Sequence, residues 1–150
     1  MRHICLILFL LFAQASMSSA QEIISPNKNI KVVLVTKAAS DTARYGQPYF
    51  SVRYKSGAKY IEVLPNSPLG IIRSDQAFSD NLRLIRASKP AAIRERYTMV
   101  SGKRAVCSND GTERVLRYEN SNHQELDLIM RVYDNGIAFS YRFPAHSDSV

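Results

Sequence analysis

The sequence is poor in cysteine, with only Cys5 and Cys107 among its 150 residues and no Cys-x-x-Cys pair. Cys5 lies in a segment that we expect to be removed, so Cys107 would remain alone. One cysteine cannot close an internal disulfide, and the fold must then depend on an apolar core. No histidine lies beside Cys107 in the sequence, and we interpret it as a half-buried strand residue rather than a nucleophile.

Long apolar runs are missing except near the N-terminus. The apolar run from Ile4 to Ala13 follows a basic start and precedes Ser18-Ser19-Ala20, a pattern typical of a secretory signal peptide that is cleaved after Ala20. An N-terminal membrane anchor is the alternative, but the run is far shorter than the ~20 residues that span a bilayer. We therefore divide the chain into a signal peptide, residues 1–20, and a mature domain, residues 21–150. We expect a secreted or periplasmic protein without a membrane span.

Acidic residues are outnumbered. The chain has 20 Lys and Arg against 13 Asp and Glu, and loss of Arg2 with the signal peptide leaves 19 against 13, a net charge of +6. Such an excess can indicate nucleic-acid binding when it is clustered. Here the basic residues are scattered, and several alternate with apolar residues as on a solvated strand face. We therefore expect no nucleic-acid partner.

Amphipathic helical patterns, internal repeats and glycine-rich phosphate loops are also absent, and short β-branched or alternating segments take their place. Turn clusters separate these segments, among them Pro65–Pro68, Asn109–Gly111 and Asn120–Asn122. The sequence predicts an all-β fold, an antiparallel β-sandwich or barrel. The strands expected with most support span residues 30–36, 48–54, 59–64, 82–87, 97–100 and 112–119.

A β-hairpin is predicted over residues 125–144. Asn135-Gly136 is the preferred pair for a two-residue type I′ turn, whose central positions both need positive φ. Folding the flanks back about this turn places apolar residues opposite one another on one face of the hairpin, which we expect to point into the core. The predicted pairs are Val132 with Phe139, Met130 with Tyr141, and Leu128 with Phe143.

Four segments in this order resemble the N-terminal domain of glycoside hydrolase family 97. They are Ser25-Pro26-Asn27, Gly46-Gln-Pro-Tyr-Phe-Ser-Val-Arg-Tyr54, Ser67-Pro-Leu-Gly70, and Arg131 to Pro144. Members of that family are exported α-glucosidases and α-galactosidases. The resemblance implies a β-sandwich of the super-sandwich type placed before a (β/α)₈ barrel. In the family the barrel carries the acid/base carboxylates, a calcium ion sits at the active site, and the sandwich helps to shape that site.

The chain departs from the family by stopping at Val150, before any barrel. We expect it to be a fragment whose sandwich is incomplete at the C-terminus. An unpaired sheet edge and exposed apolar surface should follow, and with them poor solubility or oligomerisation.

Candidate catalytic residues cannot be assigned from this sequence. Glycoside hydrolysis usually needs two carboxyl groups flanking the bond. We interpret Glu125 and Asp127 as solvated strand charges and Asp134 as a turn cap, while Asp110, Glu113 and Asp80 could line a loop edge. His123 in a turn and His146 in the tail do not form a metal-ligand pattern. We therefore predict no catalytic, cofactor-binding or metal-binding residue, and no cofactor in this chain.

The alternative is a free-standing exported carbohydrate-binding module. Sugars stack on aromatic rings, so α-linked oligosaccharides are possible partners. The chain has no tryptophan, which weakens the case for a dedicated platform. The tyrosines available for stacking are Tyr45, Tyr49, Tyr60, Tyr97 and Tyr118.

Overall fold

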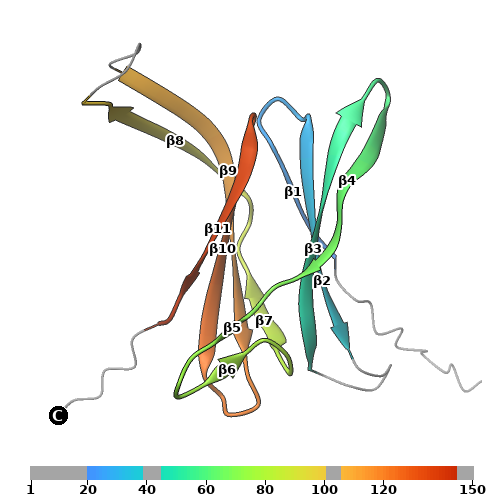
Figure 1. Ribbon diagram of the computed structural model, residues 1–150, viewed down its shortest axis with the longest axis vertical. Helices are drawn as coiled ribbons and strands as arrows, with labels where there is room; N and C mark the ends of the chain where they lie inside the picture. Colours follow the sequence, from blue (N-terminus) through green and yellow to red (C-terminus); the bar gives the residue numbers. More distant parts are fainter. Residues whose placement is uncertain (1–19, 39–44, 101–105, 145–150) are drawn as a thin grey trace, which may run out of the picture.

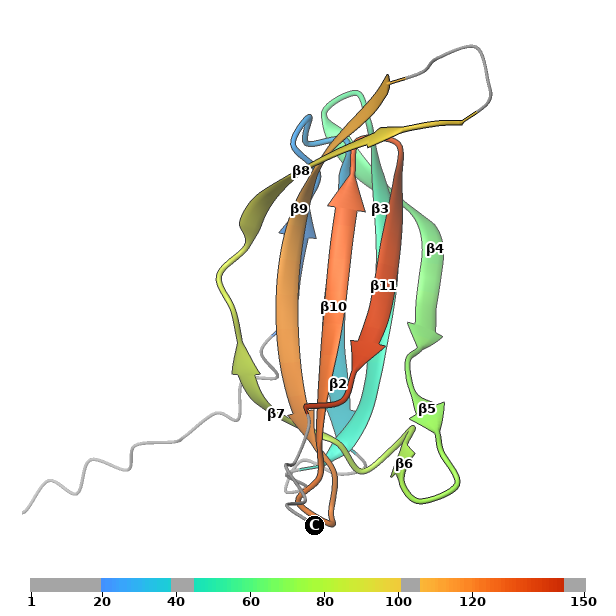
Figure 2. The same ribbon diagram turned by 90° about the vertical axis from the view of Figure 1, so that its left-hand side faces the viewer.

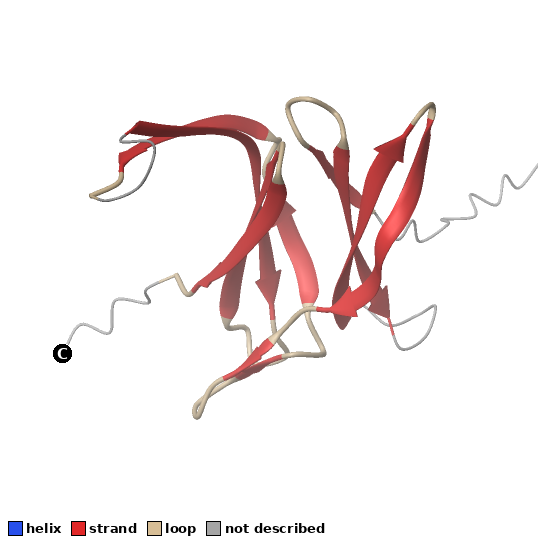
Figure 3. Ribbon diagram, turned by 45° about the horizontal axis from the view of Figure 1, so that its top comes forward, coloured by secondary structure: helices blue, strands red, loops and turns tan. Residues whose placement is uncertain are grey.

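The computed structural model describes residues 20–38, 45–100 and 106–144, which contain strands and no helix (Figure 3). Two antiparallel sheets face each other as a β-sandwich (Figure 1), as predicted. No helix in the described part of the chain is long and apolar enough to cross a membrane. The predicted signal peptide lies outside the described residues except for Ala20.

The first sheet is a meander of four strands in sequence order. Ile30, Val32 and Leu34, which alternate along the predicted strand over residues 30–36, are buried and face the second sheet. Gly57 supplies the positive φ of 62° that the β3–β4 turn requires. The strands are β1 (Gln21–Ile24), β2 (Ile30–Ala38), β3 (Gly46–Ser56) and β4 (Lys59–Pro68).

Two predictions for the first sheet are corrected. Strand β1 was not predicted, and the expected break at Pro65–Pro68 is part of β4. Proline is tolerated there because β4 is an edge strand, and the β3–β4 ladder is irregular next to it, between Phe50 and Arg53.

The second sheet has the order β11-β10-β9-β7, with β8 pairing the outer part of β9. Its inward face supplies Leu116, Tyr118, Leu128, Met130 and Val132, all at most 1% exposed, to the shared core. The strands are β7 (Arg83–Ala87), β8 (Ala91–Thr98), β9 (Val106–Glu119), β10 (Glu125–Tyr133) and β11 (Gly136–Arg142).

The turn predicted at Asn109–Gly111 is wrong, because β9 runs straight through it and pairs with β8. A Cβ atom on Gly111 would lie 2.7 Å from Cδ1 of Tyr133. Gly111 therefore serves close packing of an aromatic ring on the strand rather than a turn. Beyond it, the β8–β9 pair extends past the body of the sandwich as an arm (Figures 1 and 2).

The β10–β11 hairpin exists, but its register differs from the prediction by two residues. Asp134 and Asn135 form the loop, so Val132 lies opposite Ile137, and Met130 opposite Phe139. A shift of two keeps every side chain on its predicted face, and the apolar face does point inward. Neither Asn135 nor Gly136 has positive φ, so the type I′ turn is also wrong.

A short two-stranded unit, β5 (Ile71–Ile72) and β6 (Ala77–Phe78), connects the sheets. Leu69 and Phe78 are buried at this end of the core. Gly70 passes so close to the neighbouring segment that a Cβ atom would lie 2.5 Å from Cα of Ser79. Its backbone N–H donates to the hydroxyl of Tyr141 on β11 at 2.9 Å, which ties the connection to the second sheet.

Among the described residues β11 pairs only with β10 and is an edge strand, and whether strands are missing beside it stays a prediction. Apolar side chains are exposed near it and on the arm, including Phe139, Leu64, Tyr97 and Val106. Whether this surface causes oligomerisation stays a prediction.

Candidate functional site

The outward face of the second sheet carries a row of charged residues in register across four strands. Arg142 on β11 lies opposite Asp127 on β10, Asp127 opposite Arg117 on β9, and Arg117 opposite Arg86 on β7. We call these four residues the arginine row. The alternation of β9 and β10 that buries Leu116 and Leu128 inward turns Arg117 and Asp127 outward together.

Asp127 is the centre of the row, and its side chain is only 1% exposed. Nε of Arg117 donates to Oδ1 at 2.7 Å, and Nη2 of Arg142 donates to Oδ2 at 2.8 Å. The hydrogen bond from Arg117 lowers the pKa of Asp127 below its ordinary value, against the opposing effect of burial, with Arg142 adding to the lowering. The prediction that Asp127 is solvated is therefore wrong, because two guanidinium groups replace water around it.

Glu125 is also held by this row. Its Oε2 lies 3.0 Å from Nη1 of Arg117, so one guanidinium group bridges both carboxylates that the sequence placed on the outward face. The carboxylates of Glu125 and Asp127 are thus held in ion pairs that link β9 and β10.

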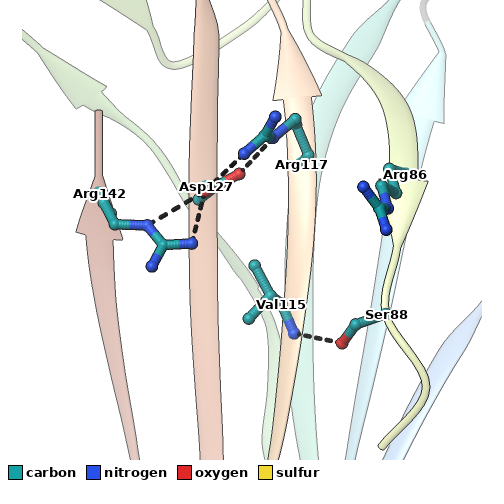
Figure 4. Close-up of a pocket in the computed structure, with 6 residues that line it drawn as sticks. All are labelled: Arg86, Ser88, Val115, Arg117, Asp127 and Arg142. Carbon is teal, nitrogen blue, oxygen red and sulfur yellow. Dashed lines mark hydrogen bonds and ion pairs between the residues drawn. The ribbon is translucent and has the colours of Figure 1, made fainter. Parts of the chain in front are cut away.

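A pocket of about 190 Å³ opens beside Asp127 (Figure 4). Ser88 fixes one wall, because its N–H donates to the carbonyl of Val115 at 2.8 Å and its Oγ accepts from the N–H of Val115 at 2.9 Å. The pocket is lined by the apolar side chain of Val115, by Ser88 and by the arginine row. The six lining residues are Arg86, Ser88, Val115, Arg117, Asp127 and Arg142.

A second ion-pair cluster lies nearer the arm. Arg131 donates to Glu113 at 2.7 Å and to Glu95 of β8 at 2.8 Å. The hydrogen bond to Glu113 raises the pKa of Arg131, and burial raises the pKa of Tyr133, whose hydroxyl donates to Glu95 at 3.1 Å. Glu113 is thus part of the sheet and does not line a loop edge.

The other candidate acids are separated from one another. Asp134 does not cap its own turn; its Oδ1 accepts from the N–H of Asn27, in the β1–β2 turn, at 2.8 Å. Asp110 pairs with Arg94 on the arm, and Asp80 is exposed near β6. These positions bring no two of them together as a glycosidase pair.

His123 and Cys107 take no part in the site. Nδ1 of His123 lies 2.9 Å from Oε1 of Glu119, and this contact is the main cause that lowers the pKa of Glu119. Cys107 is a free, half-buried strand residue as expected. His146 lies outside the described residues. Within the described ranges, no group of three or more His, Cys, Asp or Glu side chains could hold a metal ion.

The tyrosines are dispersed. Tyr118 is buried in the core, Tyr97 is exposed on the arm, and Tyr49 and Tyr60 lie on neighbouring strands of the first sheet with lysines over their rings. Tyr45 has Arg83 near its ring. They therefore do not gather on one strand or sheet as a stacking platform.

Comparison with known families decides the identity of this sandwich. The family model described as "Glycosyl-hydrolase 97 N-terminal" matches residues 23–150. The chain belongs to this family. The family-97 match begins inside β1 and covers the ten other described strands, including the complete arginine row.

Relatives of this family-97 domain are much longer than the chain. A protein named as a probable retaining alpha-galactosidase from Streptomyces bingchenggensis is 34% identical over 88 residues, which cover 59% of this chain and 14% of that protein. Solved structures of a Glycoside Hydrolase Family 97 enzyme from Pseudoalteromonas sp. strain K8, in complex with panose and with acarbose, superpose with TM-scores of 0.65 and 0.66 at 19% identity. Each match covers 85% of this chain and 18% of the enzyme.

Proposed function

We propose that the chain acts as a non-catalytic N-terminal β-sandwich that packs on the catalytic (β/α)₈ barrel of a family-97 α-glycosidase and helps to shape its active site. The observation that carries this proposal is the family match over residues 23–150 in a chain that spans 18% of the solved enzymes. The greater part of such an enzyme lies outside the segment that this chain matches, and in this proposal that part carries the catalytic centre.

The chemistry of the outward face supports a non-catalytic role. Asp127, Glu125 and Glu113 each pair with arginine, whereas glycoside hydrolysis usually needs two carboxyl groups placed on either side of the bond that is cleaved. The catalytic carboxylates in this proposal belong to the barrel.

Calcium, which the family resemblance implies for the complete enzyme, does not fit the described residues. Calcium takes six to eight oxygen ligands, commonly from clustered carboxylates. The most buried carboxylate here, that of Asp127, has both oxygens occupied by Arg117 and Arg142. We therefore assign no calcium ligand to this chain.

The proposed setting is outside the cytoplasm, because residues 1–20 have the pattern of a cleavable signal peptide. The proposed substrate class is α-linked oligosaccharides. The support is that the Streptomyces relative is named as a probable retaining alpha-galactosidase and that solved structures of the Pseudoalteromonas enzyme are in complex with panose and with acarbose.

A chimera tests this proposal. Residues 23–150 would replace the structurally matching segment of the Pseudoalteromonas enzyme, and hydrolysis of panose would be measured. We expect an active chimera, an inactive barrel when the segment is deleted, and no hydrolysis by the chain alone. Hydrolysis by the chain alone would contradict the proposal.

Calorimetric titration of the chain with maltose and panose separates the proposal from a free-standing sugar-binding module. A supporting domain should give no saturable heat. Saturable binding in the micromolar to millimolar range would favour the module instead.

A further inference from the structure

Arg86 reaches the outward face through an irregularity in the β7–β9 ladder. Arg83 lies opposite Glu119, Leu84 opposite Tyr118, and then Arg86, not Ile85, opposite Arg117. The extra residue is a β-bulge, which bends the strand and changes the face of every side chain after it. Without the bulge, strict alternation from Arg83 would place Ile85 outward beside the pocket and Arg86 inward, on the core side with Leu84.

The bulge sets two like charges directly opposite each other on adjacent strands. Such a pair is unfavourable unless a counter-charge lies between or beside the two groups. Asp127, the one carboxylate of the row, bonds both Arg117 and Arg142, and the neighbouring Glu125 bonds Arg117. Two guanidinium groups therefore take up both carboxylates, and Arg86 has no hydrogen-bond or ion-pair partner among the described residues.

Figure 4 shows how the charges point. The guanidinium of Arg117 is directed at Asp127, whereas Arg86 stands apart on the opposite side of the pocket. Val115 and Ser88 also line the pocket, and the carbonyl of Ser88 already accepts from Nε of Arg114 at 2.9 Å. The open donors at this end of the row therefore belong to arginine.

We propose that the Arg86 end of the arginine row is a binding site for a small oxyanion, in which the guanidinium of Arg86 donates to two oxygens of one ligand. Arginine presents a planar fork of donors that matches carboxylate and phosphate oxygens. The ligand supplies the negative charge that the row lacks. This site is separate from the role proposed above, and its test does not depend on the chimera.

The experiment titrates the full chain with sodium phosphate and, in a second series, with sodium acetate. Sodium chloride at matched ionic strength is the reference, because screening alone changes with salt. The readouts are calorimetry and the Nε–Hε resonances of arginine. We expect saturable binding and a shift of the Arg86 resonance. A response to phosphate identifies a tetrahedral oxyanion, and a response to acetate identifies a carboxylate.

Matched variants make the test specific. Arg86→Gln should weaken binding by roughly tenfold or more, since a charged hydrogen bond is lost, and Arg86→Lys should weaken it less. Arg96→Gln is the control, because Arg96 is an exposed arginine on β8 of the same sheet, outside the pocket. A response to phosphate and acetate no greater than that to chloride would overturn the proposal. Equal weakening by Arg86→Gln and Arg96→Gln would do the same.

Discussion

The two faces of β10 are buried by opposite means. Inward, Leu128 is 1% exposed and lies in an apolar core with Met130 and Val132. Outward, the neighbouring Asp127 is also 1% exposed, but guanidinium groups surround it. Removal of the inward apolar side chains from water stabilises the fold. On the outward face, removal of the charged groups from water costs free energy, and the ion pairs with arginine mainly offset that cost. Equal burial therefore does not mean equal contribution to stability.

The largest effect is expected on the inward face. Leu128→Ala should lower the free energy of unfolding by about 3 kcal/mol, since it removes buried methyl groups and leaves a cavity between the sheets. Urea denaturation followed by circular dichroism measures the change. Ile129→Ala, on the half-buried outward side of the same strand, is the control and should cost clearly less.

Removing the central carboxylate should have the next largest effect. Asp127→Asn keeps the shape but sets an amide between two guanidinium groups, and we expect a loss of about 2 kcal/mol. That value is below the range for a fully buried pair, because the side chain of Arg142 is 59% exposed to screening water. If Asp127→Asn lowered the free energy of unfolding as much as Leu128→Ala does, the two faces would contribute equally to stability, which would contradict this expectation.

Of the two faces of β10, only the outward face should lose stability when the pH is lowered. The pKa of Asp127 is lowered in the folded state, so its contribution is fully present above the unfolded value of about 3.9 and is lost as pH falls through the folded pKa. Glu119 adds to the same trend. Unfolding free energies between pH 7 and pH 2 should therefore decrease on the acid side, and less steeply in Asp127→Asn. An unchanged slope in that variant would contradict the assignment.

The smallest effect on stability is expected for an arginine–aspartate ion pair that is exposed to solvent. Arg94 and Asp110 on the arm pair at 2.8 Å, but their side chains are 75% and 52% exposed. Arg94→Gln should leave the melting temperature unchanged within error, because water and salt screen such a pair. A measurable decrease would mean that the β8–β9 arm is more protected than its exposure indicates.

The features that could be predicted from the sequence are those set by the alternation of apolar and polar residues along a strand. The all-β class, the inward residues of β2 and the apolar face of the last hairpin follow from period-two patterns, and the structure confirms them. Sequence reasoning failed where tertiary contacts override local signals. Gly111 looks like a turn residue but lies under the ring of Tyr133, and Asp134 bonds the distant Asn27 instead of capping its turn.

The arginine row shows the same limit at the candidate site. Outward positions for Arg117 and Asp127 could be read from alternation, and so could an ion pair between neighbouring strands. The position of Arg86 could not, because it depends on one extra residue in β7 that no local pattern in the sequence indicates.

The hydrogen bond between Asn27 and Asp134 joins residues that are 107 positions apart. The first four strands pair in sequence order, apart from one bridge between Gly46 at the start of β3 and Leu82, so most of the first sheet can assemble while the chain is still emerging from the ribosome. The β1–β2 turn, however, has to wait for this hydrogen bond until Asp134 has been synthesised. We therefore expect closure of the sandwich to come late, with the apolar face of the first sheet exposed until the β10–β11 hairpin has formed.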